Sequence, residues 1–310
     1  MLELSVLIPT HNPDAQRLRR TFAGLKAQTL DAEMWEVVLI DNASTDPILA
    51  ETFNDDAPIA LRLVDEPQLG LTAARRRGFA EAHAPLVVLV DDDNVLAPDY
   101  LEHVVRIFAG HPELGAIGGK SLPDFERNPP AELHEFLPLL ALRDLGCEPN
   151  VSRGLRPAGS KLNEYPVAAA PIGAGMAIRR EAALQWLRTE KDCAISDRRG
   201  RELSSGGDND LVFSIMEHGW EVGYFPVLVL THIIPAGRLD EHYLARLNRG
   251  IQKSWMQVLS KHEANPWPSI AAWTVPLREL KAWVTYRAWS SPAARIRWQG
   301  ACGHFEGRAR

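Results

Sequence analysis

Short apolar runs alternate with amphipathic stretches through the first 118 residues of the chain. The apolar runs contain β-branched residues and end in polar residues, at 4–8, 37–40, 60–64, 86–90 and 116–117. The stretches between them repeat apolar residues at helical spacing, at 14–28, 46–53, 71–82 and 98–109. Continuous apolar strands that alternate with helices predict an α/β fold, a mostly parallel sheet with helices on both faces. In such folds ligands bind beyond the carboxyl ends of the strands.

The regular alternation stops at Gly119. Residues 119–166 are rich in Pro, Gly and Asn and predict long loops around a short helix. Order then returns as a strand, a helix, a polar loop, a helix and two strands, at 171–178, 180–187, 188–205, 206–218, 221–225 and 227–231. The residues from 237 onward predict helices interrupted at four prolines.

Composition argues against several classes of protein. The 310 residues are 45% apolar and 24% charged, as in ordinary globular proteins, and a net charge of −6 argues against a nucleic-acid binder. The three cysteines are far apart without a CxxC pair, which disfavours a disulfide framework or a zinc ribbon and fits a reducing compartment. The first apolar run stops at Pro9 with no basic region before it, so we expect a buried strand of a cytoplasmic protein rather than a signal peptide. The other runs fall far short of the roughly 20 apolar residues of a spanning helix.

The residues from 237 to 310 differ from the rest in charge and aromatic content. They hold 12 Lys and Arg against 5 Asp and Glu, a balance of +7 that leaves −13 elsewhere, and six of the nine tryptophans. Tryptophan and positive charge suit the boundary between water and anionic lipid. We expect this tail to dock on an acidic membrane surface, at the inner membrane face, or on a partner. The alternative is a helical hairpin packed on the rest of the chain, with its tryptophans in a core.

Three carboxylates follow the predicted strand at 86–90. Asp91, Asp92 and Asp93 repel one another at the end of a buried strand, and desolvation adds to the cost of their charges. A divalent cation would relieve that cost, because carboxylate oxygens suit Mg²⁺ or Mn²⁺, and these ions also bind substrate phosphates. The alternative is a solvated acidic turn that caps the helix starting near Pro98.

Other polar residues at element ends are weaker candidates. Arg75 lies in a run of three arginines that point in different directions at about 100° per residue on a helix, so at most one of them faces a phosphate. Asp208 and Asp210 open a helix after two glycines, either as caps or with a catalytic base among them. His232 follows an apolar strand, as a core or surface histidine or as a metal ligand.

Taken in order, six motifs resemble those of the family 2 glycosyltransferases, a large group of inverting enzymes with a GT-A fold. They are SVLIPTHN at 5–12, VVLIDNASTD at 37–46, GLTAARRRG at 70–78, LVDDDN at 89–94, GAGMAIR at 173–179 and GGDNDL at 206–211. The resemblance covers roughly residues 4 to 235. It implies a GT-A-type, Rossmann-like sheet flanked by helices, followed by a C-terminal helical tail.

The resemblance also divides the chain. Residues 1–118 would be the nucleotide-sugar-binding half and residues 119–236 the acceptor-binding and catalytic half of one GT-A domain, with 237–310 as the basic, Trp-rich helical tail. In the first half, Pro9, Thr10 and the turn of Asp41 and Asn42 would hold the nucleotide base. Many family members have two acidic residues at that turn, and Asn42 here leaves uridine and thymidine carriers open.

The remaining site residues follow from the resemblance in the same way. Arg75 matches the arginine near the ribose and diphosphate. Asp91 and Asp92 would lie at the ribose side, and Asp93 would coordinate the metal with Asp91 close by. His232 matches a histidine that completes the metal site in some GT-A enzymes.

Asp208 matches the acidic residue that serves as catalytic base, although Gly207 stands where the family usually has Glu. The implied reaction moves a sugar from a UDP- or dTDP-sugar to a hydroxyl of a carbohydrate or lipid-linked acceptor, in polysaccharide or glycan synthesis. A divalent cation, Mn²⁺ or Mg²⁺, and an arginine would neutralise the leaving diphosphate. A base on the face opposite the leaving group gives a single displacement with inversion.

Two other functions are alternatives. A non-catalytic sugar-nucleotide-binding protein of the same fold is expected where the metal triad is degraded or the base is missing. A nicotinamide-dependent oxidoreductase needs a glycine loop after the first strand, where this chain instead has residues 9–12, Pro-Thr-His-Asn.

Overall fold

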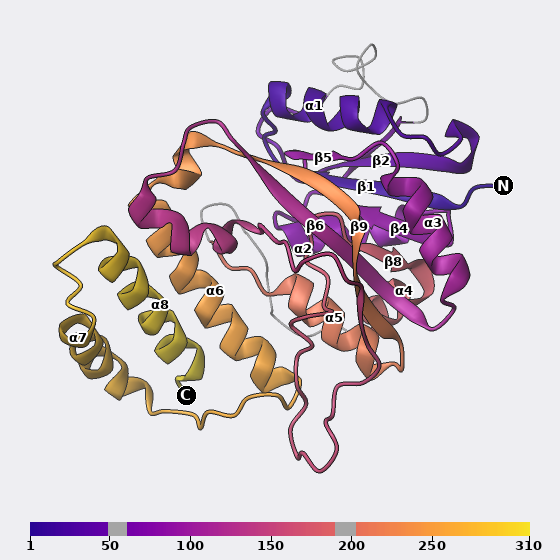
Figure 1. The fold of residues 1–310 in the computed structure, drawn as a ribbon. Helices are drawn as coiled ribbons and strands as arrows, with labels where there is room; N and C mark the ends of the chain where they lie inside the picture. Colours follow the sequence, from indigo (N-terminus) through magenta and orange to yellow (C-terminus); the bar gives the residue numbers. More distant parts are fainter. Residues whose placement is uncertain (49–60, 190–202) are drawn as a thin grey trace.

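One sheet of nine strands organises the fold in a computed structural model, which describes residues 1–48, 61–189 and 203–310 (Figure 1). Its first half is parallel, and its four strands lie in a fixed spatial order. They are β3 (Leu61–Asp65), β2 (Trp35–Asp41), β1 (Leu4–Thr10) and β4 (Leu86–Leu89). Their carboxyl ends therefore meet at one edge of the sheet, as the alternating pattern predicts.

The second half of the sheet is mixed. β8 (Ala177–Arg179) runs antiparallel to both β4 and β6 (Leu114–Phe125), and β6 runs parallel to β9 (Glu221–Ile234). Two short strands, β5 (Asn94–Leu96) and β7 (Asn150–Ser152), pair antiparallel with β9. The strand β5 brings the residues just after β4 against the end of β9.

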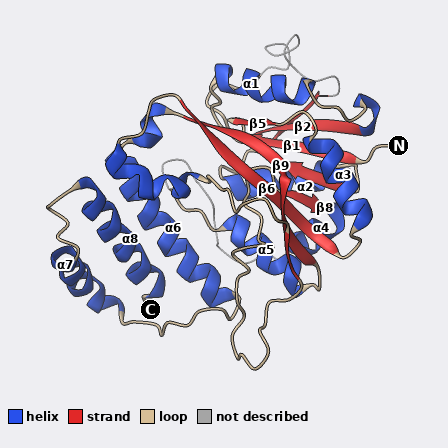
Figure 2. Cartoon of the chain, in the orientation of Figure 1, coloured by secondary structure: helices blue, strands red, loops and turns tan. Residues whose placement is uncertain are grey.

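Helices cover both faces of the sheet, because successive strand residues point to opposite sides (Figure 2). Leu4, Val6 and Ile8 of β1 pack with α1 (Ala15–Lys26) and α3 (Tyr100–Gly110). Leu7 packs on the other side, in a core shared with α2 (Leu71–Glu81), α4 (Arg180–Thr189) and α5 (Gly207–Glu217). The predicted fold class is confirmed. The connections and tail include the 3₁₀ helices η1 (Ala32–Met34), η3 (Ala131–Leu140), η4 (Ala236–Leu239) and η5 (Ala272–Thr274).

The loop predicted from Gly119 is wrong for the first seven residues, which belong to β6. β6 pairs with β9 across a register shift near Gly118, and a Cβ on Gly119 would lie 1.9 Å from the Leu228 carbonyl oxygen. Glycine is therefore required there. The glycine that contributes to the loop prediction is present because the two strands lie very close together. The two strands predicted at 221–225 and 227–231 are one strand, β9, and of the strand predicted at 171–178 only the end belongs to β8.

Three predicted elements fall partly outside the described residues, and the strand expected at 60–64 is one of them, because the second described range begins at residue 61. The helix expected at 46–53 extends beyond residue 48, where the first described range ends, and the polar loop expected at 188–205 contains the gap at 190–202. The helices predicted at 14–28, 71–82, 98–109 and 180–187 correspond to α1, α2, α3 and α4.

The tail is helical, as predicted, and consists mainly of α6 (Glu241–Lys261), α7 (Val275–Thr285) and α8 (Pro292–Arg308). α8 lies along α6, and α7 packs on the outer side of α8 (Figure 1). Glycines on one face of α8 allow this approach, because a Cβ on Gly303 would lie 2.0 Å from the Arg249 carbonyl oxygen of α6.

The six tail tryptophans divide between the two expected environments. Trp255 packs against the core beneath the sheet, and Trp298 donates a hydrogen bond from its ring nitrogen to the Glu279 carbonyl oxygen. The other four are exposed at the surface, at Trp267, Trp273, Trp283 and Trp289. No helix in the described ranges is long and apolar enough to cross a membrane.

A buried ionic cluster joins the end of α6 to α5. His262 lies with Nε2 2.8 Å from an Asp210 carboxylate oxygen and Nδ1 2.8 Å from a Glu217 oxygen, and its ring stacks on Phe213. Burial opposes charge on the ring, but the hydrogen bonds to the two carboxylates raise the pKa of His262 above its ordinary value. Lys261 also donates to Asp210, at 2.7 Å. The position of Asp210, two residues after Asp208, predicts a role at the start of the helix or toward the acceptor. In the structure its carboxylate instead joins the start of α5 to the tail.

We expect His262→Gln to lower the free energy of unfolding by about 1–3 kcal/mol near pH 6, the cost of leaving buried polar groups without a partner. A raised pKa in the folded state means that this contribution is fully present below the ordinary histidine pKa and is lost as pH rises through the folded-state pKa. The difference between wild type and variant should therefore shrink at alkaline pH. Chemical denaturation across pH measures it, with His242→Gln, at an exposed histidine, as the control. A difference that is constant with pH would contradict the protonated ring.

Candidate active site

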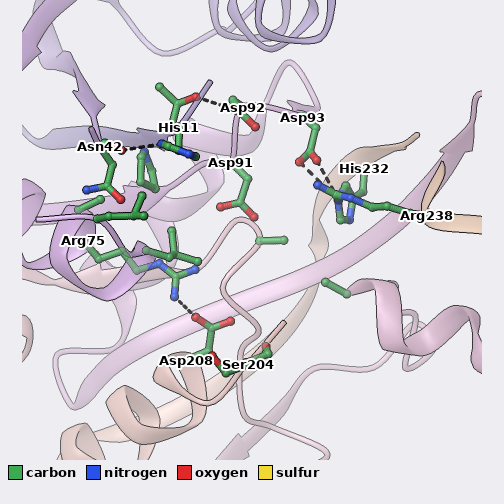
Figure 3. Close-up of a pocket in the computed structure, with 18 residues that line it drawn as sticks. His11, Asn42, Arg75, Asp91, Asp92, Asp93, Ser204, Asp208, His232 and Arg238 are labelled. Atoms are coloured by element: carbon green, nitrogen blue, oxygen red, sulfur yellow. Dashed lines mark hydrogen bonds and ion pairs between the residues drawn. The ribbon is translucent and has the colours of Figure 1, made fainter. Parts of the chain in front are cut away.

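A polar pocket lies beyond the carboxyl ends of β1, β2 and β4 (Figure 3). Nine of the ten residues to which the family resemblance gives a role in the site line it, and Asp41 does not. The nine are Pro9, Thr10, Asn42, Arg75, Asp91, Asp92, Asp93, Asp208 and His232. They come from six separate parts of the chain, which the sheet edge and α5 bring together.

The Asp41 carboxylate, at the end of β2, bonds the backbone of the following loop. Asp41 is buried, and its carboxylate accepts hydrogen bonds from the backbone N–H groups of Ser44 and Ile48 at 3.1 and 3.0 Å. These bonds shape the loop after β2. The carboxylate is thus already satisfied by the chain's own backbone, which does not support the expected contact with a nucleotide base.

Asn42 joins the end of β2 to the start of α2. Its amide nitrogen donates to the carbonyl oxygens of Glu66 and Gln68 at 3.2 and 2.8 Å, and its amide oxygen accepts from the Gly70 N–H at 2.8 Å. Gly70 has a φ of 140°, a conformation that favours glycine. These contacts fix where α2 begins and therefore where Arg75, one turn further on, points.

Arg75 reaches the pocket and pairs with Asp208. One Asp208 oxygen receives the Arg75 guanidinium, and the other accepts the Gly173 N–H at 2.9 Å. A Cβ on Gly173 would lie 2.3 Å from that oxygen, so a side chain there would break the arrangement. The other two arginines of the run point elsewhere, as expected. Arg76 lies over the Trp186 ring and Arg77 pairs with Glu81.

Asp91 and Asp92 lie in the pocket although burial makes their negative charges unfavourable. Burial raises the pKa of Asp92 to about 7, with a further contribution from the charge of Asp93, although Thr10 donates a hydrogen bond to its carboxylate. Burial also raises the pKa of Asp91, which the Arg75 charge partly offsets. Both carboxylates would gain from added positive charge in the pocket.

Asp93 meets His232 and Arg238 because of strand pairing. Asn94 of β5 lies opposite His232 of β9, which sets Asp93 beside the histidine, with 3.4 Å between its Oδ1 and Nε2 of His232. Arg238, from η4, places a guanidinium nitrogen 3.0 Å from the other Asp93 oxygen. Arg238 is not predicted from the sequence. It lies six residues after His232, and no sequence motif relates an arginine at that spacing to this kind of site. His11, Ser204 and Ser205 also line the pocket without having been predicted.

The residues suited to a divalent cation share this pocket but are not arranged as a closed site. Among the described residues, no three His, Cys, Asp or Glu side chains form a group that could hold a metal ion. The Arg238 guanidinium lies instead at Asp93. The donor chemistry nevertheless fits a hard cation. Two carboxylates have raised pKa values, and the buried Nδ1 of His232 has no hydrogen-bond partner in the described part of the chain.

Comparison with known proteins identifies the family to which the chain belongs. The profile of Glycosyl transferase family 2 matches residues 5–185, and the chain belongs to that family. It is 35% identical over 152 residues to validoxylamine A glucosyltransferase of Streptomyces hygroscopicus subsp. limoneus, covering 47% of this chain and 33% of that protein. It is 25% identical over 148 residues to a glucosyl-dolichyl phosphate glucuronosyltransferase of Haloferax volcanii, covering 47% and 46% of the two chains. The chain thus spans less than half the length of these curated relatives.

The fold of the chain also resembles that of a solved structure. The structure of the mannosyltransferase PcManGT of Pyrobaculum calidifontis, solved with GDP-Man and Mn²⁺, superposes with a TM-score of 0.57 and 19% identity, covering 97% of this chain and 73% of that one. The GT-A fold that the motifs predict is confirmed.

We expect Asn42→Ala to lower the free energy of unfolding by about 1–3 kcal/mol, because it leaves the Gly70 N–H and two carbonyl oxygens near the pocket without their partner. Asn150→Ala, at the exposed start of β7, is the control and should change stability by less than about 0.5 kcal/mol. Denaturant unfolding measures both. Equal stability of the two variants would show that the Asn42 amide does not hold the start of α2.

Proposed function

We propose that this chain is a metal-assisted, inverting glycosyltransferase that moves a sugar from a nucleoside diphosphate donor to an acceptor hydroxyl. One observation carries the proposal. A carboxylate at a helix N-terminus, Asp208, lies paired with Arg75 in the same pocket as the three carboxylates that end β4. This combination offers a proton acceptor together with groups that bind a diphosphate and its counter-ion.

The donor would lie along the edge of the sheet. Pro9, Thr10 and Asn42 line the end of the pocket at β1 and β2, where we place the base of a UDP- or dTDP-sugar. Arg75 would bind the diphosphate, and Asp91 and Asp92 would lie beside the ribose. The acidic pocket repels a bare diphosphate, so donor binding requires the positive charge of Arg75, of Arg238 and of a divalent cation.

Asp208 is suited to serve as the general base. It lies in the first turn of α5, at the end of the helix where the backbone N–H groups point outward. Arg75 pairs with that carboxylate, and a donor diphosphate would compete for the guanidinium. Asp208 would then be left to accept the proton of the acceptor hydroxyl as it attacks the anomeric carbon, which gives a single displacement with inversion.

The residues that would hold a divalent cation are Asp93, Asp91 and His232, with Mn²⁺ or Mg²⁺ as the ion. When bound, such a cation would neutralise charge on the leaving diphosphate. Arg238 must give up Asp93 for this to happen, and its guanidinium would then be available to the diphosphate. The Mn²⁺ named with the Pyrobaculum enzyme supports this choice of ion.

The proposed reaction also requires an acceptor. We propose a hydroxyl of a carbohydrate or of a lipid-linked glycan, in polysaccharide or glycan synthesis. The name of the Haloferax relative, a glucuronosyltransferase for glucosyl-dolichyl phosphate, supports a lipid-linked acceptor.

Asp208→Asn keeps the shape of the side chain and removes the base. We expect transfer to fall by about 10² to 10⁴, the usual contribution of general-base catalysis, while UDP or dTDP affinity stays near normal. A screen of nucleotide sugars identifies the donor, and NMR of the product should give the anomeric configuration opposite to that of the donor. The control is Asp65→Asn, at the exposed end of β3. Near-normal transfer by the variant, or a product with retained configuration, would refute the assignment.

Asp93→Asn should abolish the increase in UDP or dTDP affinity that Mn²⁺ produces, because a neutral amide is a poor ligand for a hard cation. Isothermal calorimetry with and without Mn²⁺ measures the effect, and requires no turnover. Asp124→Asn, at an exposed carboxylate of β6 outside the pocket, should leave the Mn²⁺ effect intact. An undiminished Mn²⁺ effect in Asp93→Asn would exclude this residue as a ligand.

A further inference from the structure

The outer face of α7 is apolar over its whole length. Trp273, just before the helix, is 75% exposed, and Leu277 and Leu280 are 62% and 60% exposed. At about 100° per residue Leu277 and Leu280 fall on one side of the helix, opposite Ala282, which is buried against the tail. Neighbouring exposed side chains extend the patch, at Trp283, Val284, Tyr286 and Trp289.

Positive charge borders this apolar face. Arg278, Lys281 and Arg287 are exposed, and none of them has a carboxylate within ion-pair distance in the described ranges of the chain. Glu279, the acidic residue of α7, points the other way and pairs with Arg249 of α6 at 3.0 Å. The surface that α7 presents is therefore apolar, aromatic and cationic, with no acidic side chain in it.

The position of α7 leaves this surface open. The helix is the outermost element of the tail, with α8 between it and α6 (Figure 1). Contiguous exposed apolar patches are rare on soluble proteins and mark places where another surface binds.

We propose that α7 and its flanking tryptophans dock on the surface of an anionic lipid bilayer, with the helix lying in the plane of the membrane. Tryptophan and tyrosine favour the level of the lipid headgroups, the leucines enter the acyl boundary, and the three cations bind anionic headgroups. The 11 residues of α7 span only about 16 Å, about half of a bilayer core, so the helix lies on the membrane and does not cross it.

Charge favours a membrane over a second copy of the chain. A symmetric dimer through this face would bring Arg278, Lys281 and Arg287 close to the same residues of the partner, with no acidic side chain on the face to compensate. Interface cores of proteins are also depleted in charged residues. An anionic bilayer supplies both an apolar layer and the opposite charge. This inference does not rest on the proposed transfer reaction, since it needs neither donor nor acceptor.

Vesicle binding tests the proposal on the full chain. Wild type should float with vesicles of phosphatidylcholine and phosphatidylglycerol at low salt, and bind weakly to phosphatidylcholine alone. High salt should weaken but not abolish binding to the mixed vesicles, because the apolar contribution is not screened. Brominated lipids should quench part of the tryptophan fluorescence, since the exposed tryptophans enter the bilayer.

Two variants separate the apolar from the ionic contribution. Leu277→Ser with Leu280→Ser should reduce partitioning by at least roughly tenfold, because each buried methylene contributes about a fourfold change. Arg278→Gln with Lys281→Gln should reduce it by roughly tenfold or more, at about fivefold for each cation, and only on anionic vesicles. Val227→Ser, at an exposed valine of β9, is the control for the first variant and should bind like wild type. Thermal unfolding of all variants establishes that they are folded.

Three results would overturn the proposal. Wild type that fails to bind anionic vesicles at low salt excludes membrane docking. Binding that survives both double variants places the contact on another surface. Self-association in sedimentation that disappears in Leu277→Ser with Leu280→Ser, without vesicle binding, assigns the α7 face to a second copy of the chain. Each outcome is independent of whether the chain transfers a sugar.

Discussion

The burial of acidic side chains at one edge of the sheet is the constraint on which the site depends. Three carboxylates end β4 and a fourth opens α5, all in one pocket. Burial and mutual repulsion raise the pKa values of Asp91 and Asp92, so the pocket favours any positive charge that enters it. Arg75 and Arg238 supply that charge from outside the strands. A nucleoside diphosphate would offer the two arginines a new partner, and its counter-ion would do the same for the carboxylates. The ion pairs of this pocket could therefore be replaced when such a ligand binds.

The surrounding fold holds these charges in place through short backbone connections. The pairing of β5 with β9 sets Asp93 beside His232, and the Asn42 amide fixes the start of the helix that carries Arg75. Gly173 lets the backbone approach Asp208 closely enough to donate a hydrogen bond. Each of these contacts joins segments that are distant in the sequence, so the site forms only when the whole sheet has assembled.

The tail contributes in two different ways. α6 is tied to α5 by the cluster of His262, Asp210 and Glu217, so the helix that carries Asp208 is held from its far side by the tail. α7 makes no such connection and presents an apolar, cationic face. A single basic, Trp-rich segment thus contains both a structural support for the helix that carries Asp208 and an exposed apolar surface.

The sequence by itself determined the parallel half of the sheet, its covering helices and half of the residues that line the pocket. The sheet and its helices depend on local periodicity, which can be read along the chain. The pocket residues depend on the rule that strand ends meet at one edge and on the resemblance of six motifs to those of the family 2 glycosyltransferases. Only the tertiary structure decided that residues 119–125 form a strand, that Asp41 bonds its own loop, that Arg238 meets Asp93, and which tail tryptophans lie at the surface. Apart from Asp41, whose partners Ser44 and Ile48 lie within seven residues, the deciding partners are far away in the sequence, as Leu228 is from Gly119, and no local pattern records them. Long-range contacts depend on how the elements pack, and packing is a property of the folded chain as a whole.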